Sequence, residues 1–425
     1  MKVGKKILLV EPNFPVPAKS KNHKDFLPIG LLKIASYLKA NGVDIKLVRG
    51  ELKIEDLDFK PDEIWITSLF TYWSKYVKDS VAYYKKIFPY AKVVVGGIYA
   101  SLMPEHCKEY TKCDDVFIGV HKEAEKYPPS YELINHNNPH PIDYQIIHAS
   151  RGCIRRCDFC GTWKIEPVFE PKTSIRDEIK YSKIIFYDNN LLANPYIEEI
   201  LQELIELKKK RKILWCETQS GFDGRILMDK PHLARMLKEA SFRYPRIAWD
   251  WRYNEYEKIK KQINILLNAG YKSKDIYIFM LYNWEIPFKE MEMKRVKCWE
   301  WKVQIADCRY RPLDQTFDNY DPEVVGQTNK DYYIHIKGGW TDALIKQFRK
   351  NVRRQNICVR HGFPFHSKLL ERKGVSKGLS MKLRNLSKRD VLKILPDAWF
   401  PDEICESSIN ASLRSAQNDL QNGEI

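Results

Sequence analysis

The sequence carries its strongest signal in the stretch Ser150-Arg-Gly-Cys-Ile-Arg-Arg-Cys-Asp-Phe-Cys160. Its three cysteines, Cys153, Cys157 and Cys160, follow a C-x3-C-x2-C spacing, which places three thiols on one short loop. A closed [4Fe–4S] cluster takes four cysteines, so three cysteines leave one iron open to an outside ligand. The stretch therefore predicts an iron–sulfur cluster with one free coordination site.

Other interpretations of the cysteines stay open. Zinc prefers four ligands in a tetrahedron, so the triplet would have to recruit a fourth ligand such as His148. Chance clustering gives no reason for the tight spacing. The remaining cysteines of the ten form no second tight cluster, and we expect them to act as small buried side chains. A second metal site built from Cys298 and Cys308 also stays open.

The length and composition predict a globular protein of two or three domains. The chain has 425 residues, of which 44% are hydrophobic, enough for real cores. It contains no run of about 18 apolar residues, so no transmembrane helix and no membrane partner are expected. The apolar run that Glu11-Pro12 ends is too short for a signal peptide. We therefore expect a cytoplasmic protein with reduced thiols.

The first part of the sequence alternates between strand and helix patterns. Helices are expected at Pro28–Gly42 and Ser74–Ile87. Apolar runs of strand length occur at Lys6–Glu11, Asp44–Val48, Glu63–Thr67, Lys92–Val95 and Asp115–Gly119. Such alternation predicts an α/β fold with a Rossmann-like parallel sheet, and with any ligand at the carboxyl ends of the strands.

A second series of strands follows a linker rich in proline and asparagine, which resist both helix and strand. We expect helices at Pro195–Lys208, His232–Ala240 and Asn254–Asn268. The six strand candidates are Gln145–Ala149, Lys183–Tyr187, Ile213–Thr218, Arg246–Trp251, Asp275–Tyr282 and Lys302–Asp307. Six such units fit a partial (β/α)6 barrel. The cysteine loop follows the first strand, at the end where such barrels carry their chemistry.

The cysteine triplet with its flanking residues resembles that of the radical S-adenosylmethionine (SAM) superfamily. The resemblance implies that the open iron holds the amino and carboxylate groups of S-adenosylmethionine. It also implies that reductive cleavage gives a 5′-deoxyadenosyl radical, which abstracts hydrogen from a substrate, and that an electron donor such as flavodoxin or ferredoxin supplies the electron. Cys153, Cys157 and Cys160 would be the catalytic metal ligands, and Phe159 would pack near the adenine of the cofactor.

The region before the linker resembles the cobalamin (B12)-binding domain of one radical SAM subfamily. The matching elements are Phe26-Leu-Pro-Ile-Gly-Leu-Leu32, Ser68-Leu69 and Gly96-Gly97. The resemblance implies that Ser68, Leu69, Gly96 and Gly97 contact cobalamin. The sequence departs from the pattern of this domain at two places. The Asp-x-His-x-x-Gly element that supplies a histidine to cobalt is absent, as in many members of the subfamily, which excludes histidine ligation but not cobalamin binding. Gly119–Glu125 matches the usual Gly-Glu-Gly-Glu only in part. A domain that no longer binds cobalamin is the alternative.

Polar residues that follow the barrel strands are the next candidates for binding S-adenosylmethionine. The resemblance implies that Asp188 and Asn189 line the amino group of the cofactor, although both residue types also favour turns. Gln219 and Asp250 would hold the ribose or the methionine end. The alternative for Asp250 is a structural ion pair with one of three nearby arginines, Arg243, Arg246 or Arg252.

The predicted domain order is a Rossmann-like domain at 1–126, a linker at 127–142, a radical SAM core at 143–320 and a basic C-terminal region at 321–425. Within the last region, Lys346–Arg389 holds fourteen basic residues and one acidic residue, so this segment alone carries +13, against a net charge of +16 for the whole chain. Such a block favours polyanions, so modification of tRNA or another nucleic acid is one function hypothesis. The others are a radical enzyme acting on a small molecule or peptide, by cobalamin-dependent methylation or by rearrangement, and a non-catalytic metal-stabilised binding protein.

Overall fold

The structure, a computed structural model, describes residues 4–16, 27–52, 58–135, 141–318, 334–371 and 376–404. The chain forms two compact units. The first comprises Met1–Glu203, Lys210–Leu214 and Pro312–Tyr332. The second comprises Leu204–Lys209, Trp215–Arg311 and Tyr333–Ile425. The predicted domain boundaries were placed from sequence motifs, whereas these units are defined by how compactly the chain packs. The predicted boundaries therefore stay predictions.

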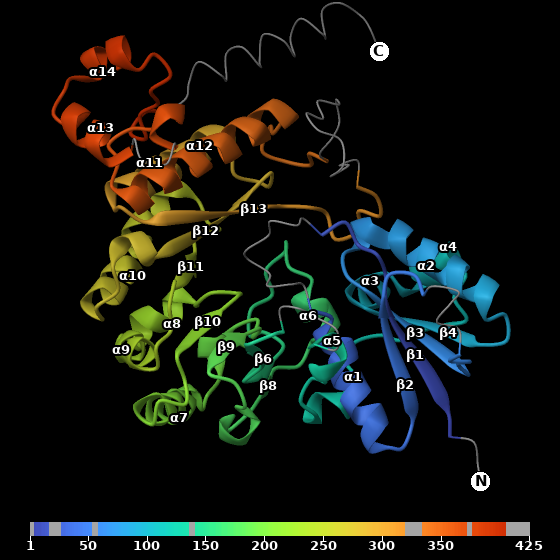
Figure 1. The fold of residues 1–425 in the computed structure, drawn as a ribbon. Helices are drawn as coiled ribbons and strands as arrows, with labels where there is room; N and C mark the ends of the chain where they lie inside the picture. The colour runs from blue at the N-terminus through green and yellow to red at the C-terminus, as the bar shows by residue number, and fades with distance from the viewer. Residues whose placement is uncertain are drawn as a thin grey trace, which may run out of the picture. The chain divides into compact units, whose positions relative to one another are not determined.

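The first unit is built on a five-stranded sheet in the order β2-β1-β3-β4-β5 (Figure 1). Every neighbouring pair of strands in it is parallel. This is the strand order of flavodoxin-like doubly wound sheets, so the predicted Rossmann-like parallel sheet is confirmed. The strands are β1 (Lys6–Glu11), β2 (Asp44–Arg49), β3 (Glu63–Ser68), β4 (Lys92–Gly97) and β5 (Asp115–Val116).

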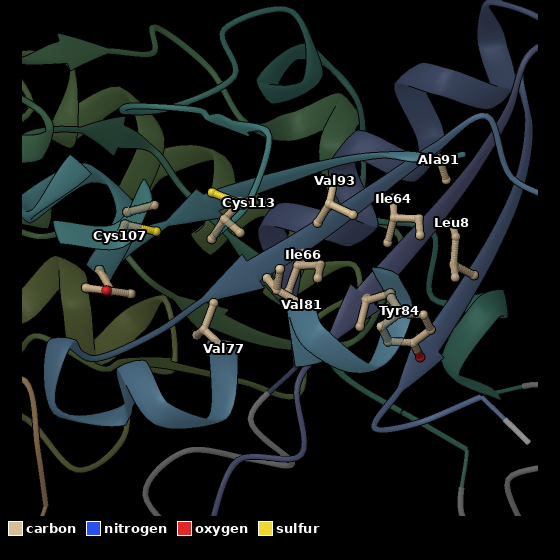
Figure 2. Packing of buried hydrophobic residues seen from close by; sticks show 14 of the residues in the cluster. Leu8, Ile64, Ile66, Val77, Val81, Tyr84, Ala91, Val93, Cys107 and Cys113 are labelled. Carbon is tan, nitrogen blue, oxygen red and sulfur yellow. The ribbon is translucent and has the colours of Figure 1, made fainter. Parts of the chain in front are cut away.

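Helices cover both faces of this sheet because successive strand residues point to opposite sides. Helix α1 (Ile29–Ala40) packs on the face of Ile7 and Leu9. Helix α2 (Ser74–Ile87) packs on the other face, where Figure 2 shows Val77, Val81 and Tyr84 beside Ile64 and Ile66. The short helices α3 (Ile98–Leu102) and α4 (Pro104–Thr111) add Tyr99, Ala100 and Cys107 to the same cluster.

The remainder of the first unit carries the cysteine loop. Strand β6 (Gln145–Ile147) pairs in parallel with β9 (Lys183–Phe186). Strand β7 (Ser150–Arg151) pairs antiparallel with β8 (Glu170–Pro171), a hairpin that the sequence did not predict. Helix α6 (Thr162–Ile165) follows the cysteines, and α7 (Ile197–Lys209) follows β9. The short helix α5 (Glu132–Asn135) lies in the predicted linker, of which 136–140 falls outside the described residues.

The second unit contains three parallel strands in the order β11-β12-β13. The six predicted strands of the core are all present, most of them shorter than predicted, whereas their closure into a barrel stays a prediction. The elements are β10 (Trp215–Thr218), α8 (Gly224–Asp229), α9 (His232–Glu239), β11 (Arg246–Ala248), α10 (Tyr256–Asn268), β12 (Tyr277–Tyr282), α11 (Phe288–Glu300) and β13 (Gln304–Arg309).

The described part of the C-terminal region is helical. It comprises α12 (Asp342–His361), α13 (Ser376–Leu383) and α14 (Lys388–Ile394). The Asn356 side chain on α12 accepts a hydrogen bond from the Ile305 N–H (2.9 Å) and donates one to the Ile305 carbonyl (2.7 Å). Helix α12 thus satisfies backbone groups of strand β13 and covers its edge.

Two predictions for this region reach beyond the described residues. The sequence Asp331-Tyr-Tyr-Ile-His-Ile336 predicts a strand, but residues 331–333 lie outside the described ranges and 334–336 are not a strand. The polar tail Ser407–Ile425 lies entirely outside them. Along the described chain, no helix has the length and apolarity needed to cross a membrane.

A fully buried ion pair fastens the end of the described chain to α11. The Arg295 guanidinium donates to both carboxylate oxygens of Glu292, each at 2.8 Å. It also donates to the Gln355 side chain (2.8 Å) and to the carbonyls of Pro401 and Glu403, each at 2.6 Å. Because the pair is fully buried, losing one partner leaves an uncompensated charge.

We predict that Arg295→Met lowers the free energy of unfolding by about 3–5 kcal/mol, because Glu292 stays charged and buried. Replacing both partners, as in Glu292→Met with Arg295→Met, restores part of that loss. Lys393→Met breaks an exposed ion pair with Asp390 and serves as the control, with an effect below about 1 kcal/mol. Denaturant titration of the full chain measures all three variants, and a double variant no more stable than Arg295→Met contradicts the prediction.

Candidate functional site

The three cysteines lie on the loop between β7 and α6. Cys153, Cys157 and Cys160 are free thiols of intermediate exposure. Five of the other described cysteines are buried, and only Cys308 among them is exposed. The Arg155 N–H donates to the Cys153 sulfur (3.3 Å), and the Cys160 N–H donates to the Cys157 carbonyl (3.0 Å). Backbone donors to sulfur stabilise a thiolate, so this donor set fits an iron–sulfur cluster.

Gly152 sets the entry of the loop. Its φ is +76°, and a Cβ placed on it would lie 2.3 Å from the Val168 carbonyl oxygen. Its N–H donates to the Glu166 carboxylate at 2.7 Å. Only glycine fits this position, because both the left-handed backbone and the close approach exclude a side chain.

Asp188 holds the residues that lead into the loop. Its fully buried carboxylate accepts hydrogen bonds from the Ala149 N–H (3.0 Å), the Ser150 N–H (2.6 Å) and the Ser150 hydroxyl (2.7 Å). Burial raises the pKa of Asp188 to about 6, and the Ser150 hydroxyl and the two N–H groups oppose that shift. The structure therefore gives Asp188 a positioning role, and its contact with S-adenosylmethionine stays a prediction.

Arg151 is the centre of a charged network beside the loop. Its guanidinium donates to Glu166 (2.7 Å) and to Nε2 of His148 (2.7 Å), and it lies 3.9 Å from the Glu125 carboxylate. Glu125 also pairs with Lys33 of α1 at 2.7 Å. Burial lowers the pKa of Lys33, and Glu125 opposes the shift. A nearby arginine can favour the thiolate form of a cysteine, but the structure engages Arg151 with two carboxylates and a histidine.

The zinc interpretation gains no support from His148. Arginine has only hydrogen-bond donors, so Nε2 of His148 must accept the hydrogen bond from Arg151 and cannot also bind a metal ion. Burial lowers the pKa of His148 well below its usual range, with Arg151 adding to the shift. Across the described ranges, no three His, Cys, Asp or Glu side chains are grouped so as to hold one metal ion, Cys298 and Cys308 included. In a cubane cluster, by contrast, each thiolate binds a different iron, so the three sulfurs need not converge on one metal ion.

A cavity of about 570 Å³ lies within the first unit. The residues for which cobalamin contact was predicted, Ser68, Leu69, Gly96 and Gly97, all line it. Its volume falls in the range of ligand pockets. Other parts of the wall come from the start of α1, from the segment after β5 and from residues around the cysteine loop, among them Pro28, Phe117, His121, Glu125, His148, Arg151, Glu166, Tyr187 and Asn189.

The ends of β3 and β4 are held together where they line this cavity. A Cβ on Gly97, whose φ is +98°, would lie 2.2 Å from the Ser68 carbonyl oxygen, so only glycine fits this position. The Ser68 hydroxyl donates to the Gly96 carbonyl (2.7 Å) and accepts from the Ala100 N–H (3.1 Å). These contacts fix the backbone of Ser68, Gly96 and Gly97 on the cavity wall.

The other predicted site residues fall in both units. Phe159 is half-buried on the cysteine loop, and Asn189 on the cavity wall accepts a hydrogen bond from the Thr162 hydroxyl (3.2 Å). Gln219 and Asp250 belong to the second unit, after β10 and β11. For all four residues the S-adenosylmethionine contact stays a prediction.

The environment of Asp250 differs from the ion pairs considered for it. Arg243 and Arg246 instead pair with Glu217, and Arg252 pairs with Glu290. Burial raises the pKa of Asp250 to about 6, and the charges of Lys294 and Arg225 oppose the shift. The three arginines considered as ion-pair partners of Asp250 are therefore paired with other carboxylates.

Several residues on or beside the cavity wall were not predicted from the sequence. Glu166 and His121 line the cavity, and Lys33 pairs with Glu125 on its wall. None of the three had a predicted role, because their positions depend on how distant segments fold together. His148 was considered only as a zinc ligand. Glu125 had one weak signal, since it ends the partial Gly-Glu-Gly-Glu match, and its carboxylate does lie in the charged network.

Comparisons with known proteins identify the class of the first domain. Residues 19–126 match the family model for the B12 binding domain. No curated protein matches the chain. The chain thus carries a B12-binding domain, and the cavity described above is lined by that domain's strand ends.

Solved structures extend the likeness to most of the chain. The radical S-adenosylmethionine methyltransferase TsrM from Kitasatospora setae, with cobalamin and a [4Fe–4S] cluster bound, matches with a TM-score of 0.53 and 13% identity, covering 74% of this chain and 77% of that one. The same protein with tryptophan substrate and the SAM analog aza-SAM bound gives a TM-score of 0.51 and 13% identity, covering 72% and 73%. The predicted resemblance to radical SAM proteins with a B12-binding domain is confirmed at the level of the fold.

We predict that Gly152→Ala reduces the iron bound after anaerobic reconstitution, because strain of about 1–3 kcal/mol would displace the loop start. Gly161→Ala is the matched control, since its Cβ would make only ordinary contacts, at 3.4 Å from Leu102. Iron and sulfide content per chain are the readouts. Equal iron in Gly152→Ala and the wild type contradicts the prediction.

Proposed function

We propose that this protein is a cobalamin-dependent radical S-adenosylmethionine enzyme that methylates its substrate. One observation carries the proposal: the same cavity is lined by the strand ends of the B12-binding domain and by Arg151 and Glu166, which hold the cysteine loop. A ligand seated on Gly96 and Gly97 would therefore lie against the residues that position the cysteines.

The residues fit both groups that this function requires. Three half-exposed thiols on one loop form the donor set for a cluster with an open iron. The cavity of about 570 Å³, with Gly96 and Gly97 on its wall, has the size of a ligand pocket. When bound, the cluster and cobalamin would supply electron transfer to S-adenosylmethionine and carriage of a methyl group.

The protein's own contribution is binding and orientation. Asp188 and Gly152 fix the backbone on the N-terminal side of Cys153, and Glu166 ties that backbone to Arg151. The Lys33–Glu125 pair extends the same network to helix α1. Because these groups already form hydrogen bonds and ion pairs with one another without a ligand, the site needs little reorganisation when a ligand binds.

We predict that replacing Cys153, Cys157 and Cys160 together by alanine abolishes both iron binding and cleavage of S-adenosylmethionine. The measurement is iron content, followed by 5′-deoxyadenosine formation with dithionite. Cys308→Ala, at an exposed cysteine outside the triplet, is the control and should retain both. Wild-type protein that binds iron but never cleaves S-adenosylmethionine would instead support a metal-stabilised binding protein.

A nucleic-acid substrate is the second candidate, favoured by the surface of α12. The exposed basic residues recur there at helical spacing, so they share one face. They are Lys346, Arg349, Lys350, Arg353 and Arg360. Such a stripe suits contact with phosphates, although one of its members, Arg353, also pairs with Glu371 at 2.9 Å.

If tRNA binds this face, Lys346→Glu with Lys350→Glu should weaken the binding. The slope of log affinity against log salt should also fall by about 2, because two phosphate contacts are lost. Lys209→Glu with Lys210→Glu, beyond the basic stripe, is the charge-matched control. Equal affinity and slope in the two double variants would remove the nucleic-acid candidate.

A further inference from the structure

His121 is held rigidly in the wall of the cavity. It lies after β5, and its Nδ1 accepts a hydrogen bond from the Ala124 N–H at 3.2 Å. Its ring stacks on Phe117 with centroids 5.6 Å apart and also contacts Tyr37, at 5.0 Å. Because three neighbours fix the ring, little side-chain freedom is lost when it contacts a ligand.

The backbone contact decides which ring nitrogen carries the proton. A nitrogen that accepts the Ala124 N–H presents a lone pair, so the neutral ring carries its hydrogen on Nε2. No other described residue offers Nε2 a hydrogen-bond partner. His121 therefore brings to a cavity wall an N–H donor that none of the described residues uses.

We propose that His121 donates a hydrogen bond from Nε2 to an acceptor oxygen of the cavity ligand. The inference rests on the proposed function, under which that acceptor is a carboxamide oxygen on the rim of the corrin ring. His121 stands within Gly119–Glu125, where the sequence departs from the Gly-Glu-Gly-Glu pattern of the subfamily. The contact is thus a property of this chain's own sequence.

The same geometry argues against His121 as a cobalt ligand. Coordination through Nε2 would require the proton to move to Nδ1, where it would face the Ala124 N–H. His148, the other histidine on the wall, accepts a hydrogen bond from Arg151 at Nε2, so its hydrogen lies on Nδ1, which is buried and has no hydrogen-bond partner among the described residues. Each of the two histidines therefore accepts a hydrogen bond through one ring nitrogen and keeps an N–H donor on the other.

Two substitutions separate the donor from the rest of the side chain. Asparagine places an amide oxygen near the position of Nδ1, which keeps the Ala124 contact, but it has nothing at Nε2. Glutamine reaches the Nε2 position with an amide N–H. We expect His121→Asn to weaken hydroxocobalamin binding by about three- to tenfold, the range of one neutral hydrogen bond. His121→Gln should stay within about twofold of the wild type.

The experiment is an anaerobic titration of full-length protein with hydroxocobalamin, followed by visible absorption. His106→Asn is the control, because His106 bonds the Tyr99 hydroxyl (2.7 Å) and is not part of the cavity wall. Melting temperatures show whether each variant is folded. Equal affinities for His121→Asn and the wild type would overturn this inference alone, whereas a wild type without affinity would overturn the proposed function as well.

A second measurement needs no variant. Wild-type protein labelled with ¹⁵N-histidine and loaded with cob(II)alamin should show no histidine nitrogen coupling in its electron paramagnetic resonance spectrum. Such coupling would mean that a histidine ligates cobalt, and it would overturn the assignment of His121 as a donor.

Discussion

The cysteine loop depends on one buried carboxylate. Strands β6 and β9 pair in parallel with Ile147 opposite Phe186, so two residues further on Asp188 lies beside Ala149. Its oxygens accept three hydrogen bonds from Ala149 and Ser150, just before the loop begins. Burial without these donors would be costly for a carboxylate, and the donors need the strand pairing to converge. The sheet register thus determines where the cysteines begin.

From that point the loop is joined to the B12-binding domain by charge pairs. Glu166 binds both the Gly152 N–H and Arg151, and Arg151 lies near Glu125, which pairs with Lys33. All of these residues belong to the first compact unit. The cavity and the cysteine loop are therefore parts of one compact unit.

Much of the fold was predictable because it follows periodic burial. Helix α2 has the predicted bounds Ser74–Ile87, and β1 has the predicted bounds Lys6–Glu11, since both carry clear apolar patterns. The β7–β8 hairpin was missed because strands of two residues have no period to detect. The contact between α12 and the edge of β13 was also missed, because it depends on one polar side chain, Asn356, that belongs to no sequence pattern.

The site was predictable where residue type alone carries the chemistry. The cysteine spacing and the two glycines at the end of β4 were found for this reason. His121 and Glu166 were missed because their roles arise from contacts between distant segments. Asp188 was found, but the structure shows that its oxygens already bind the loop backbone, a role that its position in a turn could not reveal.

The central claim is that the cysteine triplet holds a cluster with one iron open to S-adenosylmethionine. The most direct measurement is electron paramagnetic resonance of the reduced, reconstituted protein with and without S-adenosylmethionine. A cluster with an open iron should change its spectrum when the amino and carboxylate groups bind. A spectrum that S-adenosylmethionine leaves unchanged at saturating concentration would contradict this account.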